Sequence, residues 1–463
     1  MTTHSTGLDN SLLQKYNVSY YGSDYDIYDI IDDFLQDNVS EKAFYIVDLG
    51  EIHKAWIQWM TLLPNVQPYY AMKCNPNPVI LETLASLGAN FDCASENEIK
   101  QVMEIVNDPE RIIFANPCKM TSQIRYARAN DVDMMTFDCE EELYKIKLYH
   151  PYAKLVLRLA VDDSFSICKF NKKFGCYLEQ VSNILSIAKA LSLNVMGFSF
   201  HVGSNCSSPE AFYNAIKDCR KACDIAYKLG IKISLIDIGG GFPGDSRSSF
   251  EAIARQISKS INDYFYISKK SESSDNENSD YESDNELEEY SNKSDINSDN
   301  DSQTVNHEND DESQITLFNK DSKYIELLRS IKFISEPGRY FVQSSHTLVL
   351  NIIGKKTIID KENNDKKFIY YLNDGMYGSF NCIMFDHYNP KILPFNERDG
   401  VRYKSILFGP TCDSMDTICD NIELPELAIG EYIYVEEFGA YTLAAASSFN
   451  GFKTSDYKYI ARS

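Results

Sequence analysis

Several features that mark other protein classes are absent from this 463-residue sequence. Its twelve cysteines include no Cys-x-x-Cys pair and no cysteine–histidine cluster at zinc spacing, which argues against a zinc module. No apolar run is long enough to span a bilayer, and no basic patch followed by an apolar segment marks an export signal. We therefore expect no membrane association, no bound metal, and a cytoplasmic location in which thiols stay reduced.

Positive charge is also scarce. The sequence has 45 Lys and Arg against 68 Asp and Glu, a net charge of −23 that argues against nucleic acid as a partner. Residues 271–314 account for much of this, because they contain 16 acidic residues and one lysine, a net charge of −15. Almost nothing in this segment is apolar, so burial cannot offset the entropy lost on ordering it. We predict a disordered acidic insertion, which leaves a moderate charge of −8 on the remaining chain.

Short β-rich runs alternate with amphipathic helical patterns from about residue 44. The predicted strands are Tyr69–Met72, Asn90–Cys93, Arg111–Ala115, Asp133–Phe137, Lys154–Ala160, Val195–His201, Ile233–Ile238 and Lys332–Ser335. The predicted helices between them include Pro78–Leu87, Glu96–Val106, Leu178–Leu191, Pro209–Leu229 and Phe250–Tyr266. A doubly wound sheet is the alternative, but eight strand–helix repeats favour an α/β fold of the (β/α)8 barrel type, with its active site at the strand C-termini.

The pattern changes after about residue 343. Strand-like runs follow one another with almost no helical periodicity, at Thr347–Ile353, Lys367–Leu372, Ser405–Phe408 and Glu431–Glu436. We predict an N-terminal segment 1–43, a barrel domain 44–343 that contains the insertion 271–314, and a C-terminal β-sandwich or barrel-like domain 344–463. Part of the N-terminal segment is expected to join the β domain, and the run Ala43–Val47 is a further candidate for it.

The first predicted barrel strand ends on a lysine. The run Tyr69–Met72 is followed by Lys73 and then by the break Asn75-Pro76-Asn77-Pro78. A lysine fixed at the end of a strand can carry a Schiff base, because burial lowers the pKa of its amine and frees the lone pair. Most strand-end lysines simply reach into solvent, so this position needs support from elsewhere in the chain.

Two glycine-containing motifs give that support. Three consecutive glycines, 239–241, follow the seventh strand, where backbone N–H groups can converge on an anion. The run Glu336-Pro337-Gly338-Arg339-Tyr340 follows the eighth strand and adds a guanidinium suited to phosphate beside a carboxylate. A phosphate-bearing cofactor near a lysine and an acid indicates pyridoxal 5'-phosphate.

The order of the motifs resembles eukaryotic ornithine decarboxylases, which belong to the alanine-racemase-like class of pyridoxal-phosphate enzymes. The resemblance covers roughly residues 40–452 apart from the acidic insertion. It rests on the runs 70–75, 91–95, 201–204, 239–241, 336–340, 373–381, 409–413 and 439–442. It implies an enzyme that converts L-ornithine to putrescine and CO2, the first step of polyamine biosynthesis.

The resemblance also implies roles for individual residues. Lys73 would carry the cofactor, Glu336 would pair with its pyridine nitrogen, and His201 would stack on its ring. The phosphate-binding positions would be Ser204, Gly241, Gly338, Arg339 and Tyr441. Supporting polar positions would be Asp92, Glu98 and Arg158.

On the substrate side, the resemblance assigns Cys412 as the proton donor after decarboxylation, and a thiol suits this role because its pKa lies near neutrality. Asp386 and Asp413 would hold the distal ammonium of the substrate, with Phe385 beside them. Phe385 departs from the family, in which many relatives carry tyrosine, and Asn205 and Ser414 stand where glycine is frequent. The family implies a homodimer with its active sites at the subunit interface.

Two alternatives stay open. A lysine or arginine decarboxylase would use the same chemistry, and one methylene separates ornithine from lysine, a difference worth only about 1–3 kcal/mol in a pocket. Diaminopimelate decarboxylases typically carry Cys-Glu-Ser where this chain has Cys412-Asp413-Ser414, so Asp413 favours a diamine product. The second alternative is a catalytically silent homologue that binds an antizyme-type protein inhibitor, although such relatives lose cofactor or proton-donor residues that this chain keeps.

Overall fold

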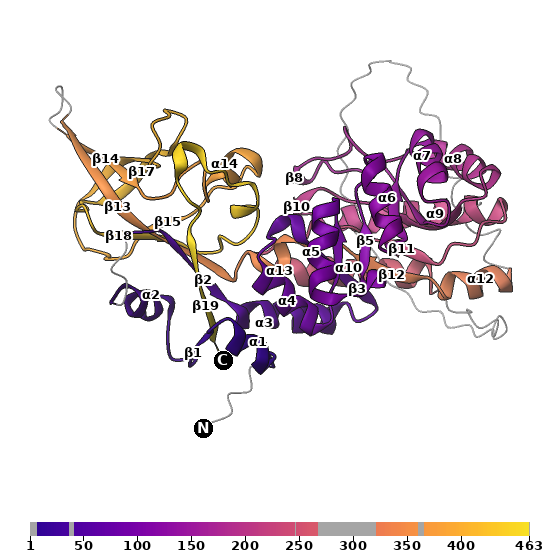
Figure 1. Ribbon diagram of the computed structural model, residues 1–463, viewed down its shortest axis with the longest axis horizontal. Coiled ribbons are helices and arrows are strands. Elements are labelled where there is room, and N and C mark those ends of the chain that lie inside the picture. The colour runs from indigo at the N-terminus through magenta and orange to yellow at the C-terminus, as the bar shows by residue number, and fades with distance from the viewer. Residues whose placement is uncertain (1–6, 37–40, 246, 267–320, 360–364, 463) are drawn as a thin grey trace, which may run out of the picture.

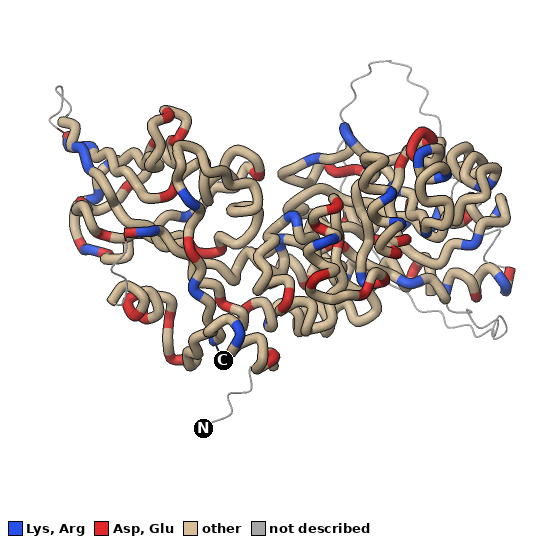
Figure 2. The backbone as a smooth tube through the Cα atoms, viewed as in Figure 1, with Lys and Arg blue, Asp and Glu red and all other residues tan. Residues whose placement is uncertain are grey.

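The computed structural model describes residues 7–36, 41–245, 247–266, 321–359 and 365–462. They form a closed barrel wrapped by helices and a second domain made mainly of strands (Figure 1). Acidic and basic residues are interspersed along both domains (Figure 2). The predicted insertion 271–314 lies outside the described residues. No helix in the described part of the chain is long and apolar enough to cross a membrane.

Eight parallel strands close the barrel in the order β11, β12, β3, β4, β5, β6, β7 and β9. Their bounds are β3 Val66–Ala71, β4 Asn90–Cys93, β5 Ile112–Phe114, β6 Met134–Phe137, β7 Lys154–Arg158, β9 Asn194–Ser199, β11 Leu235–Asp237 and β12 Lys332–Ser335. Each overlaps a strand predicted from the sequence, so the (β/α)8 barrel is confirmed. Because the strands are parallel, their carboxyl ends meet at one mouth of the barrel.

Helices cover the outside of the barrel. They are α3 Leu49–Leu62, α4 Pro78–Leu87, α5 Glu96–Val106, α6 Thr121–Ala129, α7 Glu140–Tyr149, α8 Leu178–Ala190, α9 Pro209–Lys228, α10 Arg247–Tyr264 and α12 Ser322–Arg329, with the short α13 Arg339–Val342 after β12. Local signals set their ends. Helix α4 begins where the Asn77 side chain accepts the Val79 N–H at 2.9 Å, and it ends at Gly88 in the left-handed region with φ +104°.

A small two-stranded antiparallel sheet, which was not predicted from the sequence, forms beside the mouth. Strands β8 Ser166–Cys168 and β10 Ser204–Cys206 pair antiparallel, with Ser204 opposite Cys168. They come from the loops after β7 and β9. This two-stranded sheet therefore joins two of the loops that build the site.

The second domain contains nine strands and is the separate β domain predicted from the sequence. They are β1 Ser19–Tyr21, β2 Phe44–Asp48, β13 His346–Ile359, β14 Lys366–Leu372, β15 Ile392–Pro394, β16 Arg402–Phe408, β17 Thr417–Pro425, β18 Tyr432–Val435 and β19 Asp456–Arg462. The sheet runs β1-β19-β2-β13-β14-β16-β17, with β18 and then β15 added beside β13. The first part of β13 pairs with β2 and β18 and its remainder with β14, so this long strand connects both halves of the sheet. Helices α1 Asn10–Lys15, α2 Ile27–Gln36 and α14 Asn381–Phe385 accompany it.

The predicted start of the barrel domain at residue 44 is corrected by strand pairing. Strand β2 pairs antiparallel with β13 and parallel with β19, which places Phe44–Asp48 inside the second sheet. All five of its residues are buried, as expected for an interior strand covered on both faces. The prediction that the run Ala43–Val47 joins the β domain therefore agrees with the strand pairing, whereas the predicted boundary at residue 44 does not.

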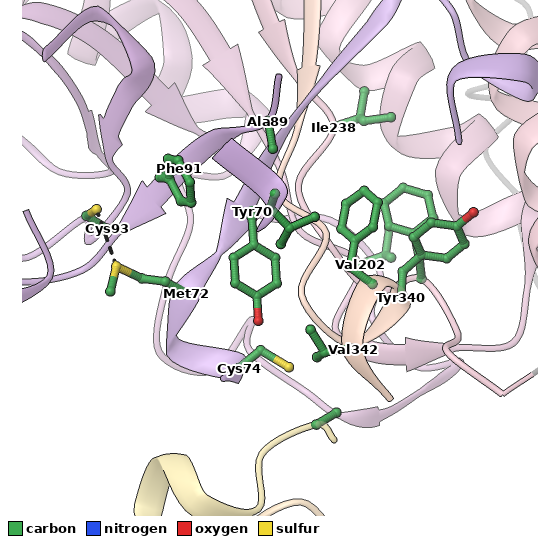
Figure 3. Packing of buried hydrophobic residues seen from close by; sticks show 14 of the residues in the cluster. Tyr70, Met72, Cys74, Ala89, Phe91, Cys93, Val202, Ile238, Tyr340 and Val342 are labelled. Atoms are coloured by element: carbon green, nitrogen blue, oxygen red, sulfur yellow. Dashed lines mark hydrogen bonds between the residues drawn. The ribbon is translucent and has the colours of Figure 1, made fainter. Parts of the chain in front are cut away.

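The chain on either side of Lys73 is fixed by buried neighbours (Figure 3). Tyr70, Met72 and Cys74 are fully buried, and the Tyr70 hydroxyl donates to the backbone oxygen of Asn75 at 3.0 Å. The sulfur of Met72 lies 3.7 Å from the thiol of Cys93 on the adjacent strand. The packed core thus holds the backbone at Lys73, and the side-chain amine of Lys73 takes no part in this packing.

Candidate active site

Lys73 lies in the short 3-10 helix η1, Met72–Cys74, directly after β3. Its Nζ is 2.5 Å from Oδ2 of Asp92, a buried residue near the end of the neighbouring strand β4. Burial opposes the charge on the amine, but the carboxylates of Asp92 and Glu336 raise the pKa of Lys73 above its ordinary value. The expected lowering of this pKa is therefore wrong, because the fold places two carboxyl groups beside the amine and the sequence pattern does not show that they are close. Asp92 is placed to accept the proton that the amine must lose before it can act as a nucleophile.

Two further carboxyl groups face the site from the adjacent strands β12 and β11. Burial raises the pKa of Glu336 well above its usual range, and the nearby Asp237 adds to the rise. Burial likewise raises the pKa of Asp237 to about 7, although the Gly239 N–H donates to its carboxylate at 2.9 Å. Such a close pair retains a proton at neutral pH, since two adjacent buried carboxylates do not both ionise readily.

The predicted supporting residues Arg158 and Glu98 surround this group. Arg158 ends β7, where burial lowers its pKa while the charges of Glu336 and Asp138 oppose that change. Its guanidinium lies 5.1 Å from the centre of the Phe174 ring. Glu98, on α5, accepts the Ala94 N–H at 2.5 Å and so fixes the loop after β4. Glu98 thus positions the backbone of the loop after β4, whereas Arg158 contributes a positive charge near Glu336.

The glycine run after β11 forms a tight backbone cradle. Gly241 has φ +107°, and a Cβ at this position would lie 2.4 Å from the Gly203 oxygen. A Cβ on Gly240 would lie 2.6 Å from the Glu336 oxygen and 2.9 Å from His201 Nε2. Side chains are therefore excluded where the loops after β9, β11 and β12 approach one another.

Ser204 and Arg339 extend the cradle toward the β domain. The Arg339 Nη2 donates to Ser204 Oγ at 3.2 Å, and its guanidinium lies 5.2 Å from the Tyr441 ring centre. Gly338 precedes Arg339, and a Cβ there would lie 2.9 Å from Cys74 Cβ. The predicted phosphate-binding residues Ser204, Gly241, Gly338, Arg339 and Tyr441 are thus connected by contacts in one region.

His201 follows β9, and its ring is held on two sides. Its Nδ1 accepts the Gly203 N–H at 3.0 Å, so a ring proton belongs on Nε2. The Phe170 ring meets it edge to face, with ring centres 5.0 Å apart and planes at 78°. Burial lowers the pKa of His201 well below its usual value, and the charges of Arg158 and Lys73 act in the same direction. A neutral, fixed imidazole suits stacking on a flat ring.

The predicted substrate residues divide between two places. Asp386 is buried beside Arg339, with its carboxylate oxygens 2.6 and 2.8 Å from Arg339 Nη2, whereas the preceding Phe385 is exposed. Cys412 is exposed on the loop between β16 and β17, where its N–H donates to Asn450 Oδ1 at 3.0 Å. Asp413 accepts from the Tyr377 hydroxyl. Among the described residues, the hydrogen bonds of Cys412 and Asp413 stay within the β domain.

Several residues of this site were missed in the sequence analysis. They are Asp237, Phe170, Tyr377 and Asn450. Asp237 had a usable signal, because it ends a predicted barrel strand directly before the three glycines. The other three act through contacts between loops that are far apart in the sequence.

Asn205 stands where glycine is frequent in the family. It adopts φ +53°, a conformation that asparagine tolerates in place of glycine.

The residues present fit pyridoxal phosphate. Glu336 Oε1 and Arg339 Nε are buried and have no hydrogen-bond partner among the described residues. An acid oxygen suits a pyridine nitrogen, and a guanidinium N–H suits a phosphate. Lys73 and the stacking face of His201 lie in the same mouth. The fold and site thus define a pyridoxal-phosphate enzyme built on a (β/α)8 barrel.

Comparison with known proteins identifies the family. Residues 49–273 match the model described as pyridoxal-dependent decarboxylase, pyridoxal binding domain. The chain is 41% identical to ornithine decarboxylase of Mus musculus over 91% of this chain and 81% of the mouse protein. It is also 41% identical to antizyme inhibitor 2 of Xenopus laevis, over 90% of this chain and 80% of the frog protein.

A solved structure agrees in fold. The arginine decarboxylase of Paramecium bursaria Chlorella virus bound to agmatine superposes with a TM-score of 0.76 at 31% identity, covering 94% of this chain and all of the viral chain. The chain belongs to the pyridoxal-phosphate-dependent decarboxylases of the ornithine decarboxylase family. The family and the cofactor indicated by the sequence motifs are both confirmed.

Proposed function

We propose that this protein decarboxylates L-ornithine to putrescine and CO2, and so serves polyamine biosynthesis. The observation that carries the proposal is the placement of Lys73 at the barrel mouth, 2.5 Å from Asp92 and beside the buried carboxyl groups of Glu336 and Asp237. The similarity to mouse ornithine decarboxylase over 91% of this chain supports ornithine as the substrate.

On the barrel side, the residues hold and polarise the cofactor. Lys73 would hold it covalently, and Asp92, which favours the ammonium form before the cofactor binds, would accept the proton that the amine gives up on binding. Glu336 keeps a proton at the position of the pyridine nitrogen, and His201 fixes the ring plane. Ser204, Gly241, Gly338, Arg339 and Tyr441 hold the phosphate. When bound, pyridoxal phosphate supplies an electron-poor ring that accepts the electron pair left by departing CO2.

On the substrate side, the carboxylates of Asp386 and Asp413 bind the distal ammonium, with Phe385 beside them. Two carboxylates around one cation favour an amino acid with a charged end. The Cys412 thiol then delivers the proton that replaces CO2 on the substrate. Proton transfer from a positioned group of this kind is worth roughly 10²–10⁴-fold in rate.

We further propose that the working unit is a homodimer with active sites at the subunit interface. Cys412 is exposed, and together with Asp413 it is anchored to Asn450 and Tyr377 of the β domain. This arrangement supports a site completed by the Cys412 loop of a second copy. The similarity to frog antizyme inhibitor 2 supports an antizyme-type inhibitor as a further partner. Twelve free cysteines support a reducing cytoplasm.

The test is release of 14CO2 from carboxyl-labelled L-ornithine, L-lysine and L-arginine, with and without pyridoxal phosphate. We expect release from ornithine that depends on the cofactor. It should be abolished in Lys73→Ala. Cys412→Ala should lower the rate of putrescine formation by about 10²-fold and redirect turnover to aberrant products, because its proton donor is missing. Cys419→Ala, a matched cysteine on β17 outside the site, should behave as the wild type.

Other outcomes would change the proposal in defined ways. Faster release from lysine or arginine would keep the mechanism and contradict ornithine as the substrate. The fault would then lie with the residues around Asp386 and Asp413. A folded protein that binds pyridoxal phosphate but releases CO2 from none of the three would contradict decarboxylation. The silent, antizyme-binding alternative would then be the better account.

A further inference from the structure

Arg339 lies between the predicted phosphate-binding residue Ser204 and the predicted substrate-binding residue Asp386. Its Nη2 donates to both oxygens of Asp386, at 2.6 and 2.8 Å, and to Ser204 Oγ at 3.2 Å. Its Nη1 donates to Gln343 at 3.2 Å. The side chains of Arg339 and Asp386 are only 6% and 8% exposed, so water does little to screen this pair. In this structure the guanidinium therefore neutralises a carboxylate that the proposed function assigns to the substrate.

Asp386 depends strongly on this contact. Burial raises the pKa of Asp386, and the guanidinium of Arg339 opposes the rise. Among the described residues its other side-chain hydrogen-bond partner is the Cys168 thiol, a weak donor 3.9 Å from Oδ1, while the charge of His387 lowers its pKa less than Arg339 does. A buried carboxylate that loses its cation and gains no other is strongly disfavoured. If another anion takes the charge of Arg339, Asp386 therefore stays ionised only when a second cation binds beside it.

A bound phosphate would compete with Asp386 for the positive charge of this guanidinium. The Arg339 Nε is buried without a hydrogen-bond partner among the described residues, and Nη2 of the same guanidinium donates to Ser204 Oγ. A phosphate bound there would place a second anion beside Asp386, with one cation between them. The distal ammonium of a diamine or diamino acid supplies the missing positive charge.

We propose that the Arg339–Asp386 pair couples the phosphate site to the diamine site, because phosphate binding releases Asp386 from Arg339 and the freed carboxylate then binds the distal ammonium. This inference rests on the proposed function and goes beyond it by making the two sites interdependent. Coupling between two binding sites is reciprocal, so the diamine must also strengthen phosphate binding. Asp386 thus restrains cofactor binding when no diamine is present.

The test measures binding without turnover. The probe is 4′-deoxypyridoxine 5′-phosphate, which lacks the aldehyde and cannot bond covalently to Lys73. It is titrated calorimetrically into the cofactor-free full-length protein in phosphate-free buffer, with and without putrescine. For the wild type we expect putrescine to tighten probe binding by about tenfold, within the usual range of coupling between sites.

Matched variants locate the effect. Asp386→Asn should bind the probe about tenfold more tightly than the wild type and should lose the response to putrescine, because Arg339 is no longer held by a carboxylate. Asp386→Glu retains the charge and should keep the response. Asp420→Asn removes an exposed carboxylate on β17, outside the site, and should leave both the probe affinity and the putrescine response unchanged. Unphosphorylated 4′-deoxypyridoxine should show no gain with Asp386→Asn.

The outcomes separate the inference from the function on which it rests. If the probe binds the wild type, but Asp386→Asn neither tightens its binding nor removes the putrescine response, the coupling is overturned and the cofactor site stands. A wild type that does not bind the probe would overturn the phosphate site itself, and the coupling with it.

Discussion

At the scale of single residues, protons and charge decide what this site can do. Lys73 retains its proton through Asp92, and Glu336 shares one with Asp237. These groups come from four different barrel strands, and burial together with the charges of their neighbours shifts the pKa values of Lys73, Glu336 and Asp237. A buried carboxyl group in this position can share a proton with a pyridine nitrogen when the cofactor is bound. The chemistry therefore depends on burial as much as on residue identity.

Phe170 gives a prediction at this scale. Its ring meets His201 edge to face, and such a pair is worth about 0.5–1.5 kcal/mol beyond the area buried. We expect Phe170→Leu to weaken pyridoxal phosphate binding by roughly two- to tenfold, because the imidazole loses the contact that fixes its plane. Quenching of intrinsic fluorescence during cofactor titration measures the change.

The control lies in the same loop. Phe165 is 54% exposed, so Phe165→Leu removes an equal number of atoms without reaching His201. Its cofactor affinity should match that of the wild type. Equal weakening in both variants would show that loop composition, not the contact with His201, is responsible.

At the scale of elements, strand β3 and strand β13 are joined just behind Lys73. Asn75 Nδ2 donates to the Gly439 oxygen at 2.9 Å and lies 3.2 Å from His346 Nε2. His346 Nδ1 lies 3.2 Å from the Val342 oxygen, which assigns the ring proton to Nδ1 and makes Nε2 the acceptor for Asn75. This buried network connects the lysine-bearing turn of the barrel to the first strand of the β domain. It requires a neutral imidazole.

The network predicts a pH dependence of stability. Burial lowers the pKa of His346 from 6.5 to about 4. Between these values the unfolded chain binds a proton that the folded chain does not, so stability is present above pH 6.5 and is lost as the pH falls toward 4. Relative to His346→Gln, the wild type should lose about 2.5 kcal/mol more unfolding free energy between pH 7 and pH 4.5.

Urea unfolding of both proteins at the two pH values, at one protein concentration, gives these free energies. The glutamine variant keeps an amide near the network but cannot titrate in this range. It is expected to be less stable than the wild type at pH 7 and to show the shallower loss. Parallel losses in the two proteins would contradict the assignment to His346.

At the scale of the whole molecule, the chemistry is divided between domains. The barrel holds Lys73, Glu336 and His201, whereas Cys412 and Asp413 lie on a loop fastened to the β domain. The homodimer proposed above follows from this division, because the Cys412 loop and the barrel mouth belong to different domains. The division also makes the dimer testable without an interface structure.

A 1:1 mixture of Lys73→Ala and Cys412→Ala provides that test. If each site takes its lysine from one subunit and its cysteine from the other, mixed dimers contain one intact site. After subunit exchange, activity should recover to about a quarter of the wild-type value, since half of the dimers are mixed and each has one working site of two. The assay is 14CO2 release from ornithine after incubation of the mixture.

A second mixture serves as its control. Lys73→Ala with Glu336→Ala places both lesions on the barrel half, so no mixed dimer has an intact site and no recovery is expected. Absence of recovery in the first mixture, with subunit exchange verified by tagged chains, would contradict a shared site.

The sequence by itself determined the architecture and the residues predicted for the site. Eight strand patterns with helices between them fixed the barrel, since hydrophobic periodicity is a local property that each segment carries alone. Motifs at strand ends predicted Lys73, Glu336 and Arg339 as site residues, because parallel strands bring their carboxyl ends to one mouth whatever the loops do.

Only the tertiary structure decided how those residues act. It moved Phe44–Asp48 into the second sheet, reversed the expected pKa shift of Lys73, and paired Arg339 with Asp386. Each outcome depends on groups far apart in the sequence that become neighbours in a buried, poorly screened space. Charge interactions and strand pairing depend on distance in space, and periodicity along the chain does not encode that distance.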